Sequence, residues 1–72
     1  MYIYDMRKLK GKIIEKCGNL GTFAQAMGWS VVTNGKKVSG ERLWDQCEIE
    51  KACNVLEIPF EEIVPYFFTR QV

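Results

Sequence analysis

The chain has 72 residues, of which 47% are hydrophobic and 12% aromatic, and its formal net charge is +1. This composition fits one small folded domain, residues 1–72, and the lack of a long apolar run or a secretory signal excludes a membrane protein and predicts a cytoplasmic one. There is no histidine or glycine-rich phosphate loop, and Cys17, Cys47 and Cys53 have no metal-site spacing, so we expect buried or half-buried thiols and neither an enzyme nor a metal or other cofactor.

Two short helices are predicted before residue 30. Asp5 can cap the first helix, and Gly18 ends it. Asn19 can cap the second helix, and Gly28 makes the turn that follows it. The residues expected to point inward are Leu9, Ile13 and Cys17 in the first helix and Phe23, Ala24 and Met27 in the second.

A third helix is predicted directly after this turn. Ser30 caps the helix, which runs to about Val38, and Gly40 ends it. The β-branched run Val31–Thr33 and Gly35 weaken it, so a shorter or partly frayed helix with its register shifted by one residue is an alternative. An apolar helix, a glycine turn and a capped second helix stand in the order of a helix-turn-helix motif, in which the second helix reads DNA.

The second half of the chain predicts two more helices. Asp45 and Glu48 have the spacing of a capping box at the start of the fourth helix. Pro59 suits the first position of a fifth short helix, and Pro65 limits how far that helix continues. We therefore expect an all-α fold, a compact bundle of about five short helices. The inward positions of the fourth helix are Ile49, Ala52, Cys53 and Leu56.

Aromatic residues near both ends of the chain are expected to be at least partly buried. Tyr66–Phe68 cannot all be hidden by a short tail, so we expect one or two of the three to fold back onto the core. Met1–Tyr4 can pack beside that tail or pair with it as a short strand. Trp29 is expected in the core, whereas Trp44 suits the core and an interface equally well.

Five stretches of sequence carry a resemblance to a known family. They are Lys8–Lys16 (KLKGKIIEK), Phe23–Gly28 (FAQAMG), Lys36–Gly40 (KKVSG), Glu48–Pro59 (EIEKACNVLEIP) and Tyr66–Phe68 (YFF). Nearly the whole chain resembles the small Cro-like and repressor-like helix-turn-helix regulators of temperate phages of Gram-positive bacteria. In length and layout it is most similar to their antirepressor, or modulator-of-repression, members. The resemblance implies a lambda repressor-like DNA-binding fold.

The resemblance also implies which positions would meet DNA. Direct readout needs forked groups such as Arg, Asn or Gln, and these positions hold none; Lys36 suits a phosphate. Leu20 stands where many relatives have a phosphate-binding glutamine, and Asn34 stands where they bury an aliphatic residue. An unpartnered amide in a core costs about 1–3 kcal/mol. The implied DNA-binding positions are Ser30, Val31, Val32, Gly35, Lys36 and Ser39.

Charge is distributed unevenly along the chain. Residues 1–40 hold seven basic and two acidic side chains, and residues 41–72 hold three basic and seven acidic ones. A basic half suits phosphate and an acidic half suits a basic protein, although the solvated faces of ordinary helices give the same pattern.

Two functions compete on this evidence. The first is an antirepressor that binds the N-terminal DNA-binding domain of the phage's own repressor in the host cytoplasm, keeps it from its operators and favours the lytic cycle. The second is a Cro-like repressor that binds operator DNA itself, and a joint complex of this protein and the repressor on DNA is compatible with both. A purely structural or other interaction role is a third option. For the antirepressor, the expected partner-binding residues are Val31, Val32, Val38, Glu41, Trp44, Asp45 and Glu48.

Overall fold

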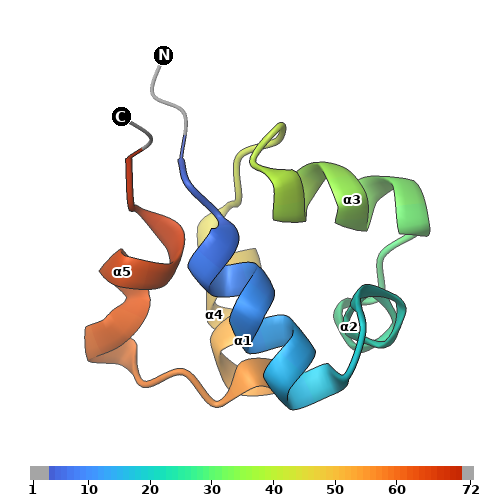
Figure 1. Ribbon diagram of the computed structural model, residues 1–72, viewed down its shortest axis with the longest axis horizontal. Coiled ribbons are helices and arrows are strands. Elements are labelled where there is room, and N and C mark those ends of the chain that lie inside the picture. The colour runs from blue at the N-terminus through green and yellow to red at the C-terminus, as the bar shows by residue number, and fades with distance from the viewer. Residues whose placement is uncertain (1–3, 71–72) are drawn as a thin grey trace.

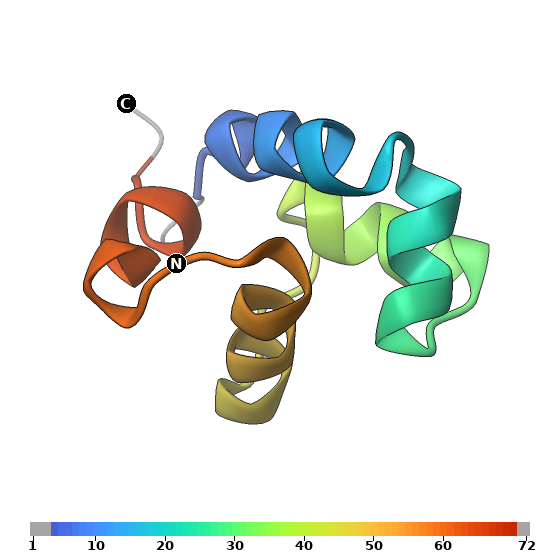
Figure 2. The same ribbon diagram turned by 90° about the horizontal axis from the view of Figure 1, so that it is seen from below.

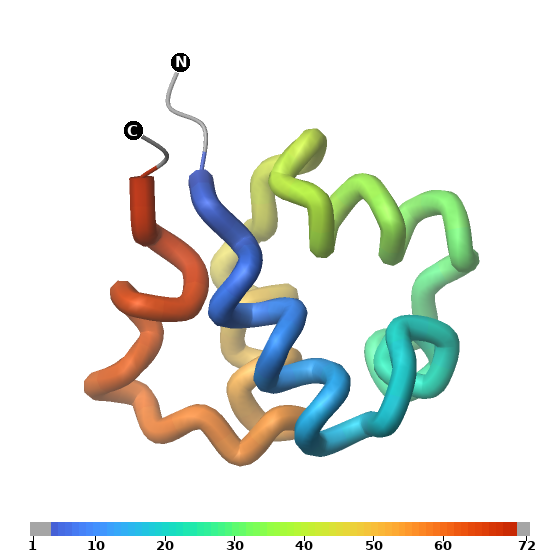
Figure 3. The backbone as a smooth tube through the Cα atoms, viewed as in Figure 1, coloured from blue at the N-terminus to red at the C-terminus, as the bar shows by residue number. Residues whose placement is uncertain are grey.

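A computed structural model of the chain describes residues 4–70 and forms an all-helical bundle (Figure 1). The tube in Figure 3 shows the same path, with α5 at one end of the molecule and α2 and α3 at the other. The predicted fold of about five short helices is confirmed. The elements are α1 (Arg7–Cys17), α2 (Leu20–Met27), α3 (Val31–Ser39), α4 (Gln46–Leu56), a 3₁₀ turn η1 (Phe60–Glu62) and α5 (Ile63–Phe67).

Local capping sets most of these helix ends. The Thr22 N–H donates to Asn19 Oδ1 at 2.8 Å and the Thr33 N–H to Ser30 Oγ at 3.2 Å, so both predicted caps are formed. Gly28 takes the left-handed conformation, with φ at 75°, and turns the chain from α2 into α3.

The predicted cap of the first helix is wrong. Helix α1 begins at Arg7 and Met6 is its N-cap residue, without a side-chain capping bond. The Asp5 carboxylate lies one residue earlier, where it accepts from the Arg7 N–H at 3.0 Å and from the Arg7 guanidinium at 2.6 Å. These hydrogen bonds to Arg7 lower the pKa of Asp5 to about 2.

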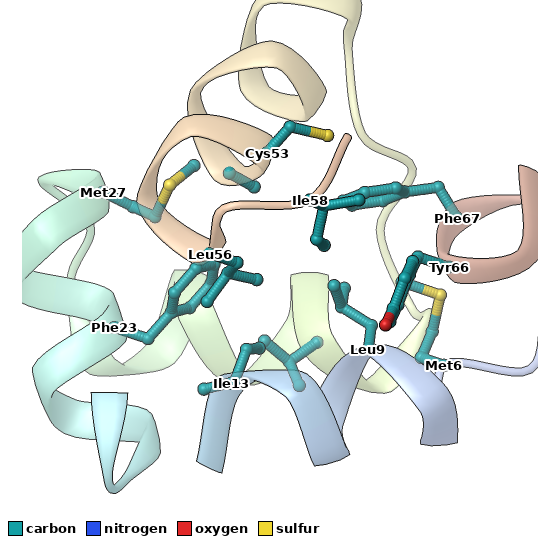
Figure 4. Close-up of a cluster of buried hydrophobic side chains, with 12 residues drawn as sticks. Met6, Leu9, Ile13, Phe23, Met27, Cys53, Leu56, Ile58, Tyr66 and Phe67 are labelled. Atoms are coloured by element: carbon teal, nitrogen blue, oxygen red, sulfur yellow. The ribbon is translucent and has the colours of Figure 1, made fainter. Parts of the chain in front are cut away.

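The core lies where α1, α2, α4 and α5 meet. Figure 4 shows their apolar side chains pointing toward one another. Four of the six residues predicted inward from α1 and α2 are at most 3% exposed, Met27 is 4% exposed and Cys17 is half-buried. Ile49 in α4 is also half-buried. The largest fully buried side chains are Phe23, Leu9, Ile13, Leu56 and Val38.

The end of the chain differs from expectation at Pro65. Helix α5 runs through Pro65 to Phe67, because Pro65 lies in the first turn, where a backbone N–H has no helical partner to lose. Tyr66 and Phe67 are buried, as expected for two of the three aromatic residues, and Phe68 remains 44% exposed.

The two ends of the described chain lie side by side. Tyr4 forms an isolated antiparallel bridge with Arg70, and the Asp5 N–H donates to the Thr69 carbonyl at 2.7 Å. The rings of Tyr4 and Phe68 meet edge to face, with centroids 5.7 Å apart. The expected pairing is thus present at Tyr4, while its first three residues, Met1–Ile3, lie outside the described part.

Candidate functional site

The outer surface of α3 carries two exposed valines among the positions that the sequence predicts to face DNA. Val31 and Val32 are 79% and 67% exposed, in the first turn of the helix. Ser30, Gly35 and Ser39 are also exposed, and Lys36 is half-buried. All six predicted DNA-facing positions therefore reach the surface at least in part. They place no arginine, asparagine or glutamine there for base readout.

Asn34 has the core position that the sequence predicts. It is 3% exposed, and its Nδ2 donates to the Leu20 carbonyl at 3.2 Å, which ties α3 to the start of α2. Its Oδ1 is buried and has no hydrogen-bond partner among residues 4–70. The helix continues from Val31 to Ser39 despite this residue and Gly35, so the shorter, shifted helix is not what forms.

Three of the expected partner-binding residues have structural contacts instead. Val38 is 1% exposed and belongs to the core, because its face of α3 points inward. Trp44 is half-buried, and its ring lies 5.1 Å from those of both Trp29 and Phe67. Trp29 too is half-buried against the core, where the sequence places it. Glu48 is half-buried and bound to Lys37.

Lys37 and Glu48 join the end of α3 to the start of α4. The Lys37 ammonium donates to Glu48 Oε1 at 2.6 Å and to the Leu43 carbonyl at 2.7 Å. The same Glu48 oxygen accepts from the Asp45 N–H at 2.9 Å, which completes the predicted capping box. The indole N–H of Trp44 donates to the Lys37 carbonyl at 2.9 Å. Of the predicted partner-binding residues, Val31, Val32, Glu41 and Asp45 remain exposed.

A second apolar surface was not found from the sequence. It consists of two adjoining hollows, of about 340 Å³ and 140 Å³, that share Ile49 and Phe68 in their walls. We call them together the α4–α5 groove. Its walls include the apolar residues Leu43, Ile49, Phe60, Ile63 and Phe68, together with Trp44 and Phe67.

The groove carries large exposed side chains and an acidic border. Phe60 in the larger hollow is 73% exposed and Leu43 in the smaller hollow is 60% exposed, and exposed apolar residues that gather on one surface mark an interaction site. Glu50 lines the larger hollow, and Glu61 and Glu62 directly follow Phe60 and are exposed. Phe60 follows a proline and belongs to no periodic apolar pattern, so the sequence offers no signal that separates it from a buried residue.

The described residues hold little else that suggests chemistry. Between residues 4 and 70, no three candidate ligands among His, Cys, Asp and Glu gather into a metal site, and no helix has the length and apolarity to cross a membrane. Cys17 is half-buried and Cys53 buried, as expected, and burial raises the pKa of the Cys53 thiol. Cys47 is exposed, so the expectation was wrong there.

Comparison with known proteins identifies relatives. Residues 2–70 match the family described as protein of unknown function DUF739. Among solved structures, the chain is similar to the modulator of repression of the temperate bacteriophage TP901-1 from Lactococcus lactis, with 46% sequence identity, a TM-score of 0.80, and coverage of 90% of this chain and 88% of that one. No curated protein sequence matches. The resemblance to phage modulators of repression is confirmed.

Proposed function

The chain belongs to the DUF739 family and is a relative of a phage modulator of repression, and on this premise we propose that it is an antirepressor that binds the N-terminal DNA-binding domain of the phage's own repressor. A repressor held in this way cannot reach its operators, which releases the lytic genes. The protein then acts in the host cytoplasm by binding alone, without catalysis.

The surface of α3 carries this proposal. We infer that α2, the turn at Gly28 and α3 form a helix-turn-helix. At the DNA-facing positions of α3, apolar side chains stand in place of the arginine, asparagine or glutamine that would read bases. Val31 and Val32 protrude from α3 side by side in sequence, and a contiguous exposed apolar patch is typical of a protein interaction site. Glu41 and Asp45 are exposed between α3 and α4. Their negative charge complements the basic DNA-reading surface of a repressor.

Direct binding to operator DNA is the second candidate. It is favoured by the excess of basic residues in the first half of the chain and by Lys36 on the outer side of α3. A joint complex with the repressor on DNA would use the same surface. Direct binding and the joint complex both require several basic side chains that contact phosphates, so the affinity for DNA would fall steeply with increasing salt concentration.

Titration of labelled operator DNA separates the two functions. The antirepressor is expected to leave the DNA unshifted on its own and to release it from the repressor. Tight, salt-sensitive and sequence-selective binding by this protein alone would establish the Cro-like function instead. Failure to bind the purified N-terminal domain of the repressor would refute the antirepressor.

Val31→Asp tests the valine surface. An aspartate in the first turn of α3 complements the helix dipole, so the fold and its circular dichroism spectrum are expected to persist. Binding to the repressor domain is expected to weaken at least about tenfold, because a charge replaces a buried apolar contact. Ile14→Asp is the matched control: Ile14 is 50% exposed in α1 and lies outside both surfaces. Equal binding of the repressor domain by the two variants would show that Val31 does not belong to the interface.

A further inference from the structure

The α4–α5 groove lies on a different part of the molecule from the valine surface of α3. Figures 1 and 2 agree in placing α5 at one end of the bundle and α2 and α3 at the other. The larger hollow is lined by the half-buried Ile49 and Ile63 and by the exposed Phe60 and Phe68, which together give the groove an apolar floor. A floor of this kind between two helices suits the apolar side of a third.

The charged side chains around the groove indicate the sign of the charge that its ligand carries. Glu50 lines the larger hollow, and Glu61 and Glu62 stand beside Phe60. Within residues 4–70, none of these three carboxylates forms an ion pair. The positive side chain Arg42 lines the smaller hollow, so the negative charge is concentrated at the Phe60 end.

We propose that the α4–α5 groove binds a basic amphipathic helix of a partner protein, whose apolar side covers Phe60 and Phe68 and whose lysines or arginines meet Glu50, Glu61 and Glu62. The inference rests on the proposed function in one respect, that the repressor domain supplies this helix. The groove then holds the repressor at a contact separate from α3.

A second copy of this chain is a poor occupant. Two grooves facing each other across a twofold axis would bring Glu50, Glu61 and Glu62 of both copies together, and like charges in an interface are unfavourable. A basic helix neutralises the same three carboxylates. Charge complementarity therefore favours a different protein over self-association.

Binding of the purified N-terminal domain of the repressor tests the groove. Phe60→Asp is expected to raise the Kd at least tenfold with an unchanged melting temperature, because Phe60 is largely exposed in the free protein. The triple variant Glu50→Lys, Glu61→Lys, Glu62→Lys is expected to weaken binding similarly, and Ile14→Asp to leave it unchanged. If the wild type binds and both groove variants bind as well as it does, the groove inference is overturned while the proposed function stands.

If the repressor domain does not bind at all, the proposed function is refuted. A synthetic peptide then tests the groove independently. The probe is an amphipathic helical peptide of leucine and lysine, with a leucine–glutamate peptide as its counterpart. Tryptophan fluorescence is expected to change with the lysine peptide alone, since Trp44 lines the smaller hollow, and Phe60→Asp is expected to abolish the change. Equal responses to both peptides, or dimers in sedimentation that Phe60→Asp dissociates, would overturn the inference.

Discussion

At the scale of single residues, Asn34 is a polar side chain in a site shaped for an aliphatic one. It makes one hydrogen bond, to the Leu20 carbonyl, and leaves its Oδ1 buried and unpaired. Leucine has nearly the same shape and no polar atom to desolvate. We expect Asn34→Leu to raise the free energy of unfolding by about 1 kcal/mol, or roughly 4–8 °C in melting temperature.

Thermal unfolding followed by circular dichroism measures this change. Asn54→Leu on the exposed side of α4 is the control, and it is expected to change stability by no more than about 0.5 kcal/mol. A lower melting temperature for Asn34→Leu would mean that the bond to Leu20 outweighs the orphaned oxygen.

Glu57 also has an unfavourable conformation. It ends α4 in the left-handed region, at φ 55° and ψ 40°, where a side chain is strained and glycine is not. Its ion pair with Lys16, at 3.5 Å, is exposed and contributes little. We expect Glu57→Gly to stabilise the fold by about 0.5–1 kcal/mol, measured by urea unfolding. Glu57→Ala keeps the strain and loses the pair, so stabilisation by alanine as well would contradict this explanation.

At the scale of the elements, the starts of α2, α3 and α4 were predictable, whereas the start of α1 and the path of the tail were not. Asn19, Ser30 and Asp45 each cap a helix through a bond to a residue three positions along, so the signal is local in sequence. Pro65 lies inside α5 because the preceding 3₁₀ turn moves the start of the helix to Ile63. That start depends on packing against α1, which no local pattern records.

The junction of α3 and α4 depends on one carboxylate. Glu48 completes the α4 capping box and neutralises Lys37, whose side chain is 12% exposed. Glu48→Ala leaves that ammonium with the Leu43 carbonyl as its remaining hydrogen-bond acceptor among the described residues. We expect a loss of about 2 kcal/mol in chemical denaturation. Glu50→Ala, in the same helix and exposed, is expected to stay within about 0.5 kcal/mol, and equal losses would refute a special role for Glu48.

At the scale of the whole molecule, the sequence revealed one candidate surface and missed the other. Val31 and Val32 were predicted to face outward because the family resemblance places them at DNA-facing positions of the third helix, and both are exposed. The α4–α5 groove joins Leu43 to Phe68, and only the fold brings residues so far apart in sequence to one hollow. Trp44 and Val38 were predicted to bind a partner but pack in or against the core. Their burial depends on neighbours from distant segments, which the local sequence does not show.

The acidic border of the groove predicts how salt affects binding to the repressor domain. Raising the ionic strength from about 0.1 M to about 1 M shortens the Debye length from about 10 Å to about 3 Å, which weakens steering between exposed charges. The association rate constant in stopped flow is therefore expected to fall at least about tenfold, while dissociation, governed by apolar contacts such as Phe60, changes little. Replacing Glu50, Glu61 and Glu62 by glutamine should flatten the salt dependence and leave dissociation nearly unaltered. If salt instead accelerates dissociation of the wild-type complex as strongly as it slows association, buried ion pairs hold the complex together and the apolar anchor is refuted.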